Sequence, residues 1–211
     1  MNSIEKKISY QTTNSYSSLN TLTASTKNVW FVWHGIGYLS KYFLKYFRHL
    51  NADENYIIAP QAPSKYYLNS EYRHVGASWL TKENTITETE NIVNYADAVL
   101  EAENIPKDKN LIVLGYSQGV SIAMRYVAKR KLHCKQLVLL SGGVPKELTA
   151  DDFKFLNAKV SFIYGDKDNY LNKERLTYEI NRAKALFGND FNTISFKGKH
   201  EVNIDIINEL V

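Results

Sequence analysis

From residue 28 onward, short apolar runs alternate with longer amphipathic segments. Each run is rich in β-branched and aromatic residues, which predicts strands over residues 28–33, 56–59, 111–114, 136–140, 160–164 and 193–196. Between these runs, apolar residues recur with the spacing of one helix face, which predicts helices over residues 39–50, 85–100, 120–127, 173–187 and 203–211. This alternation is typical of an α/β fold, a mostly parallel central sheet with helices on both faces.

The N-terminal part has a different composition, rich in Ser, Thr and Asn. Ile4–Tyr10 and Ser17–Thr23 are predicted as antiparallel strands at the N-terminal edge of the sheet. No linker, repeat or low-complexity tract divides the 211 residues, a length within the usual range of one domain. We therefore expect residues 1–211 to form a single domain.

Residues 61–83 form the longest stretch without a clear period. They carry several aromatic side chains and a histidine, namely Tyr66, Tyr67, Tyr72, His74 and Trp79. Long irregular loops in compact domains are often functional, so this stretch is predicted as an aromatic-rich cleft wall or lid. The helix that follows begins at Thr85 or Thr87, each with a glutamate three residues later as in a capping box.

Composition excludes several classes of protein. Lys and Arg (26) exceed Asp and Glu (22) by only four charges, which does not indicate nucleic-acid binding. The single cysteine, Cys134, excludes an internal disulfide and is expected to be a buried, non-catalytic thiol. No segment has the apolar character of a signal peptide or a membrane span. We expect a cytoplasmic protein, and the sequence does not indicate its oligomeric state.

The strongest motif is Gly-Tyr-Ser-Gln-Gly at residues 115–119, a G-x-S-x-G pattern between a predicted strand and a predicted helix. This setting is typical of a nucleophile elbow, a sharp turn that lifts a serine hydroxyl clear of the backbone. Ser117 is therefore the candidate nucleophile. The helix that begins beneath it adds positive potential for an oxyanion.

A serine hydroxyl needs a base, and the base needs an orienting acid. His133 and His200 are the histidines after Ser117; His200 follows the last predicted strand, where such sheets place catalytic groups. His133 lies in a basic cluster at a helix end. Two acids follow the strand at 160–164, and Asp168 is favoured over Asp166, which is expected to cap the turn. The five histidines form no HxH or HxxxH pair, so neither a metal nor another cofactor is expected.

An oxyanion hole requires backbone N–H groups that point at the developing alkoxide. Gln118, the residue after the nucleophile, is expected to supply one. The His-Gly-Ile-Gly turn after the strand at 28–33 is expected to supply the other, from Ile36 in preference to Gly35. His34 precedes the nucleophile and is interpreted as a residue that shapes this loop.

Together these elements resemble the α/β-hydrolase superfamily, and within it the phospholipase/carboxylesterase family that includes acyl-protein thioesterases. The resemblance extends from about Val29 to the C-terminus and depends on WHGIG (33–37), APQAPS (59–64), Ser-Trp (78–79), GYSQG (115–119), GDKD (165–168) and GKH (198–200). It implies an α/β-hydrolase fold, a triad of Ser117, Asp168 and His200, and oxyanion donors at Ile36 and Gln118.

The expected activity is that of a serine hydrolase that cleaves small-molecule carboxylic esters or thioesters through an acyl-enzyme. Candidate substrate-binding residues are Tyr38, His74, Trp79 and Tyr170, since aromatic walls favour apolar groups. Two alternatives stay open. One is a non-catalytic acyl- or ligand-binding module on the same fold, and the other is the same triad acting on an amide, a lactone or a C–C bond.

Overall fold

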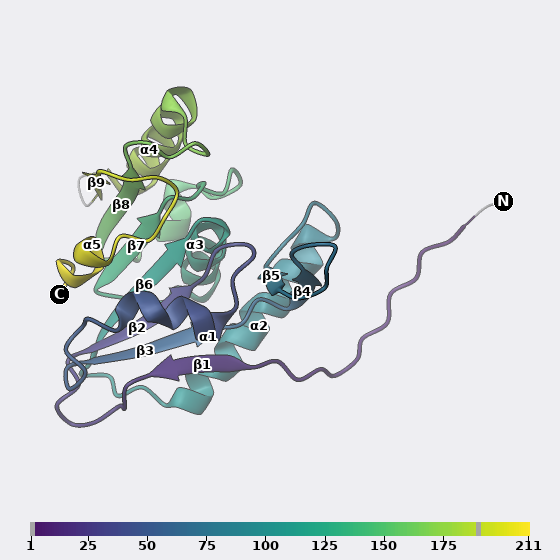
Figure 1. Cartoon of the computed structure of the whole chain (residues 1–211), viewed down its shortest axis with the longest axis horizontal. Helices are drawn as coiled ribbons and strands as arrows, with labels where there is room; N and C mark the ends of the chain where they lie inside the picture. Colours follow the sequence, from purple (N-terminus) through teal and green to yellow (C-terminus); the bar gives the residue numbers. More distant parts are fainter. Residues whose placement is uncertain (1–2, 189–190) are drawn as a thin grey trace.

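The computed structural model describes residues 3–188 and 191–211, and one seven-stranded sheet forms its centre (Figure 1). Its order is β1-β3-β2-β6-β7-β8-β9, and every pairing is parallel except that of β1 with β3. The strands are β1 (Tyr16–Leu19), β2 (Asn28–Trp33), β3 (Asn55–Pro60), β6 (Asn110–Tyr116), β7 (Gln136–Leu140), β8 (Lys159–Gly165) and β9 (Phe191–Phe196).

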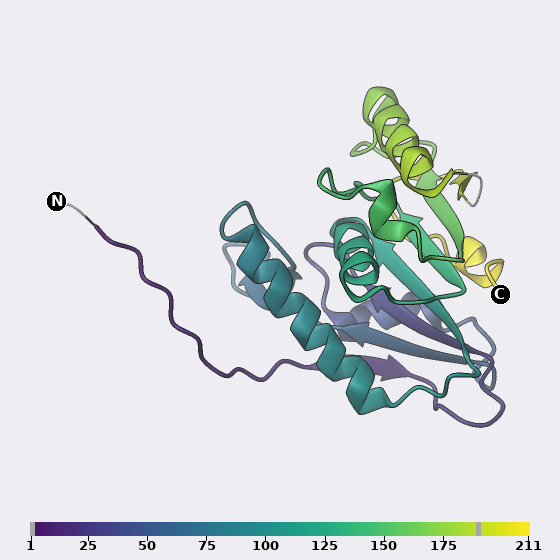
Figure 2. The ribbon, with the colours of Figure 1, turned by 180° about the vertical axis from the view of Figure 1, so that it is seen from behind.

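Helices cover both faces of this sheet. One face carries α1 (Ser40–Phe43), its 3₁₀ continuation (Leu44–Phe47) and α5 (Ile204–Asn208). The other face, seen in Figure 2, carries α2 (Thr85–Glu103), α3 (Gln118–Arg130) and α4 (Lys173–Phe187), with a 3₁₀ turn at Ala150–Phe153. The predicted fold class is confirmed. None of the helices in the described residues has the length and apolarity that crossing a bilayer requires.

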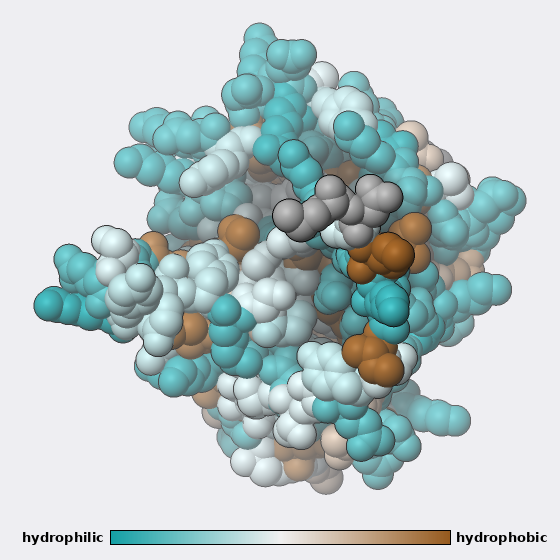
Figure 3. Space-filling view, turned by 90° about the vertical axis from the view of Figure 1, so that its right-hand side faces the viewer, coloured by the Kyte–Doolittle hydropathy of each residue, from teal (hydrophilic) through white to brown (hydrophobic). Residues whose placement is uncertain are grey.

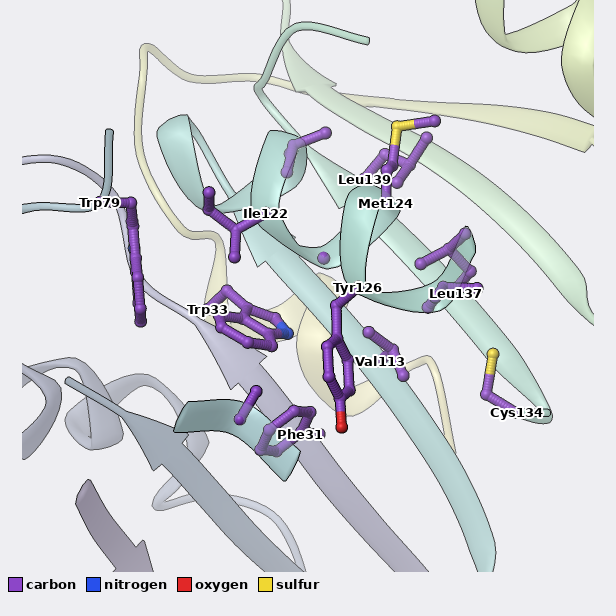
Figure 4. Close-up of a cluster of buried hydrophobic side chains, with 14 of the residues drawn as sticks. Phe31, Trp33, Trp79, Val113, Ile122, Met124, Tyr126, Cys134, Leu137 and Leu139 are labelled. Carbon is purple, nitrogen blue, oxygen red and sulfur yellow. The ribbon is translucent and has the colours of Figure 1, made fainter. Parts of the chain in front are cut away.

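The burial of β2 shows why an apolar run predicts a central strand here. Side chains alternate between the two faces of a strand. Phe31 and Trp33 pack beneath α3 in one core cluster, whereas Trp30 and Val32 belong to the cluster under α1 and α5. Figure 4 shows the first cluster, in which Tyr126 of α3 packs against both Phe31 and Trp33. A strand buried on both faces leaves no polar side, so its sequence has no alternation.

The N-terminal prediction is partly wrong. Residues 4–10 form no strand; they extend away from the body of the molecule as an exposed arm (Figures 1 and 2). The edge position beside β3 is taken by Tyr16–Leu19 alone. Ile4, Ile8 and Tyr10 would lie on one face of a strand, but strand pairing requires a neighbouring edge that the arm does not reach.

Residues 61–83 are also more regular than predicted. β4 (Ser64–Tyr67) and β5 (Val75–Ser78) form an antiparallel hairpin within this stretch. Its strands are largely polar or small, SKYY and VGAS, so they lack the apolar pattern from which a strand is predicted.

Two predicted helices differ from the prediction in local detail. The segment at 39–50 forms one α-turn followed by a 3₁₀ turn, and Tyr42 is 59% exposed although the periodicity placed it on the buried face. No capping box begins α2: its N-cap is Asn84, in the left-handed region, and the Thr85 hydroxyl donates to the Thr81 and Lys82 carbonyls instead.

Candidate active site

Ser117 lies at the junction of β6 and α3, in a strained turn. Its φ of 54° is in the region that non-glycine residues rarely adopt. The flanking glycines permit this turn, because a Cβ on Gly119 would collide with the Trp33 carbonyl oxygen and one on Gly115 with the Gly119 carbonyl. The backbone therefore has the form of the predicted elbow.

The structure brings Ser117, His200 and Asp168 together in one hydrogen-bonded chain. Ser117 Oγ lies 2.8 Å from His200 Nε2, and His200 Nδ1 lies 2.8 Å from Asp168 Oδ2. The three residues come from separate connections, after β6, β8 and β9, at the carboxyl edge of the parallel strands. With an ionised aspartate, Nδ1 carries the proton and Nε2 is left to accept from the serine hydroxyl.

Asp168 is held tightly for this contact. Its side chain is buried, and Oδ1 accepts from the backbone N–H groups of Tyr170 (2.8 Å) and Leu171 (3.3 Å). Asp166 faces another way: its Oδ1 accepts from the Gly198 N–H at 3.0 Å. Asp166 therefore fastens the turn after β8 to the loop that carries His200, and only Asp168 contacts the histidine.

Two aromatic rings flank His200. The Tyr116 hydroxyl donates to the His200 carbonyl at 2.9 Å, and its ring centroid lies 5.3 Å from the imidazole. The Tyr170 ring lies 4.7 Å from the imidazole on the cavity side. These contacts restrict the imidazole to the orientation that reaches Ser117.

The two predicted oxyanion donors border the same cavity as Ser117. Gln118 is the first residue of α3, so its N–H belongs to the helix-terminal amides that have no acceptor within the helix. The turn that carries Ile36 is held by the hairpin, since the Gly37 N–H donates to the Ala77 carbonyl at 2.8 Å.

The Gln118 side chain has a second role that the sequence does not indicate. Its Oε1 accepts from the Trp79 N–H at 2.8 Å, and its Nε2 donates to the Leu80 carbonyl at 2.8 Å. The amide thus links the elbow to the chain just after β5. Nothing in the local sequence distinguishes this glutamine from an exposed one.

The cavity beside Ser117 has a volume of about 420 Å³. It lies on the face toward which the parallel strands point, where Figure 3 shows a surface of mostly hydrophilic and intermediate residues with scattered hydrophobic ones. Tyr38 and Tyr170, both predicted to bind substrate, line it. The lining also includes residues that were not predicted from the sequence, among them Ser121, Gly143 and Arg175.

Two residues predicted to contact substrate lie outside the cavity lining, Trp79 and His74. Trp79 is 1% exposed: its indole packs 5.1 Å from that of Trp33 (Figure 4), and its Nε1 donates to the His34 carbonyl. The large apolar ring is stabilised by burial in the core rather than at a cleft. His74 lies in the exposed connection between β4 and β5, outside the cavity lining.

Other reactive side chains lie apart from this site. His34 is fully buried; its Nδ1 contacts the Gly35 carbonyl and its Nε2 accepts from the Ala62 N–H. Burial lowers the pKa of His34 to about 4. Cys134 is buried in the core (Figure 4), and burial raises the pKa of its thiol to about 12. Within residues 3–188 and 191–211, no three His, Cys, Asp or Glu side chains converge as a metal site.

Comparison with solved structures shows the fold to which the chain belongs. Maize (Zea mays) acyl-protein thioesterase 2 has a TM-score of 0.68 at 15% identity, over 93% of this chain and 96% of that one. A phospholipase/carboxylesterase from Dyadobacter fermentans gives 0.66 at 18% identity over 95% and 97%, and the Bacillus cereus carboxylesterase 0.68 at 15% over 93% and 91%. The chain therefore has the α/β-hydrolase fold, as the sequence motifs implied.

The family follows from the sequence. Residues 39–203 match the family model described as serine hydrolase (FSH1). The chain belongs to this FSH1 family of serine hydrolases, because the match covers well over half of its length. No curated protein matches the sequence at a significant level.

Proposed function

We propose that this protein hydrolyses carboxylic esters or thioesters with Ser117 as nucleophile, His200 as base and Asp168 as orienting acid. The observation that carries the proposal is the pair of 2.8 Å contacts that join Ser117 Oγ, the His200 imidazole and Asp168. Membership of a serine hydrolase family supports it.

In the first half of the reaction, Ser117 Oγ attacks the substrate carbonyl carbon while His200 Nε2 takes the hydroxyl proton. Asp168 stabilises the imidazolium through Nδ1–H. The negative charge that develops on the carbonyl oxygen is received by the N–H groups of Ile36 and Gln118. When the tetrahedral intermediate collapses, Nε2–H protonates the departing alcohol or thiol.

The second half repeats these steps with water. The imidazole takes a proton from water, the resulting hydroxide attacks the acyl carbon, and Ser117 leaves with the proton that His200 returns. No group beyond these side chains and amides is required, and the same steps serve an ester or a thioester because only the leaving atom differs.

The test is labelling by a fluorophosphonate probe together with hydrolysis of p-nitrophenyl esters. Ser117→Ala should abolish labelling and lower kcat by about 10³-fold or more. Ser121→Ala is the matched control, since Ser121 lines the same cavity but its hydroxyl donates to the Gln118 carbonyl. This control should label and turn over like the parent. A Ser117→Ala protein that kept its ester hydrolysis would refute the proposal.

A further inference from the structure

The start of α4 builds one wall of the cavity. Arg175 is the third residue of this helix, and the Asn172 side chain caps the helix by accepting from the Arg175 N–H. The Arg175 side chain lines the cavity together with Ser117 and His200, and it is 52% exposed.

Part of the Arg175 guanidinium has no protein partner on this wall of the cavity. Nη1 donates to the Tyr170 carbonyl at 3.3 Å, and Nε forms an ion pair with Glu179 Oε1 at 3.6 Å. Nη2 makes no hydrogen bond within the described residues and lies beside Gly143, where an added Cβ would be 3.5 Å from it. A guanidinium has five N–H donors, so this one retains most of its capacity for a ligand.

The neighbouring carboxylates do not face the cavity. Glu179 is 8% exposed at its side chain and its Oε2 accepts from the Val144 N–H at 2.7 Å, outside the lining. Asp168 lies behind His200 with both oxygens engaged. Among the described residues that line the cavity, Arg175 has the only permanent charge and no acidic side chain is present. Such a lining favours a substrate with negative charge.

We propose that the site selects esters or thioesters that carry a carboxylate, which Arg175 binds through its free donors. Arg175 is thus a specificity-determining residue. Arginine matches a carboxylate with two parallel N–H···O bonds, and the tether to Tyr170 orders the side chain before substrate arrives. This inference rests on the proposed hydrolase activity.

The experiment compares charged and neutral esters of matched size. p-Nitrophenyl hydrogen adipate against p-nitrophenyl hexanoate places the carboxylate in the acyl group; 4-carboxyphenyl hexanoate against phenyl hexanoate places it in the leaving group. The ratio of kcat/KM within each pair is measured for the parent, Arg175→Gln, Arg175→Lys and Lys173→Gln. Lys173 is the matched control, an exposed cation in the same helical turn but outside the lining.

In at least one pair the parent should prefer the charged ester, and the pair identifies which part of the substrate contacts Arg175. Arg175→Gln should lower that ratio about tenfold, the scale of a half-exposed charge-assisted hydrogen bond. Because the ratio compares two esters on one variant, any loss of activity common to both esters cancels. Arg175→Lys should retain part of the preference, Lys173→Gln all of it, and 0.5 M salt should weaken it.

Two results would overturn the inference in different ways. If the neutral esters are hydrolysed but no charged ester is preferred, or the preference survives Arg175→Gln, Arg175 does not select the substrate and the proposed hydrolase activity stands. If neither neutral ester is hydrolysed and Ser117 is not labelled, the proposed activity fails and the inference fails with it.

Discussion

At the scale of single residues, two aspartates two positions apart have separate tasks. Asp168 contacts His200, whereas Asp166 contacts the Gly198 N–H. Asp168→Asn should lower kcat by about 10³- to 10⁴-fold, because an amide cannot stabilise the imidazolium and favours the wrong tautomer. Asp166→Asn keeps an oxygen that accepts from Gly198, so its kcat should change less than about threefold. Steady-state kinetics with a p-nitrophenyl ester measure both, and equal losses would contradict the assignment of Asp168.

The closeness of the three proposed triad residues could be predicted from the sequence, whereas the position of Trp79 could not. Ser117, Asp168 and His200 each follow a strand of a parallel sheet, whose carboxyl ends meet at one edge, so their closeness follows from the order of motifs along the chain. The position of Trp79 does not follow in this way. An aromatic residue in a polar stretch is equally compatible with a cleft wall and a core, and only the contact with Trp33 decides between them.

At the scale of elements, the apolar strands and the long amphipathic helices could be predicted, and the hairpin of β4 and β5 could not. A run such as Asn28–Trp33 is determined by its own composition, since burial on both faces requires apolar side chains throughout. The hairpin of β4 and β5 depends instead on pairing between two weakly strand-like segments and on contact with the turn at Gly37. The contacts of Gln118 and Arg175 also join segments distant in sequence, which no local pattern records.

Substitution of Gln118 tests the link between the elbow and the chain after β5. Gln118→Leu leaves the Trp79 N–H and the Leu80 carbonyl without these partners, so the free energy of unfolding should fall by about 1–3 kcal/mol. The elbow and the chain after β5 then lose their link, and we expect kcat to fall about tenfold with a smaller change in KM, since oxyanion donors act mainly in the transition state.

Gln136→Leu is the matched control for this experiment. Its amide donates to the Leu210 carbonyl, away from the cavity lining. Chemical denaturation should show a smaller loss of stability in this variant, because Gln136 donates one such hydrogen bond and its buried Oε1 has no partner. Ester hydrolysis should be unchanged. A Gln118→Leu protein that is destabilised yet fully active would show that the side chain supports the fold alone.

At the scale of the whole molecule, His34 makes the stability depend on pH. It joins the end of β2 to Ala62 and packs against Trp79, 4.9 Å away between ring centroids. Burial lowers the pKa of His34 from 6.5 to about 4, so the unfolded chain binds one more proton than the folded chain between these pH values. The stabilisation is complete above pH 6.5 and is lost as the pH falls toward 4, at about 1.4 kcal/mol per pH unit and about 3 kcal/mol in total.

Urea unfolding between pH 6.5 and 4.5 measures this dependence. His34→Gln removes the titrating group, so its unfolding free energy should fall with acidity less steeply than that of the parent, by about 1.4 kcal/mol per pH unit. His133→Gln, which removes an exposed histidine, is the control. The comparison uses slopes because His34→Gln also disturbs packing at every pH. Equal slopes in the two variants would mean that His34 is protonated without unfolding, and its link between β2 and Ala62 would then tolerate the charge.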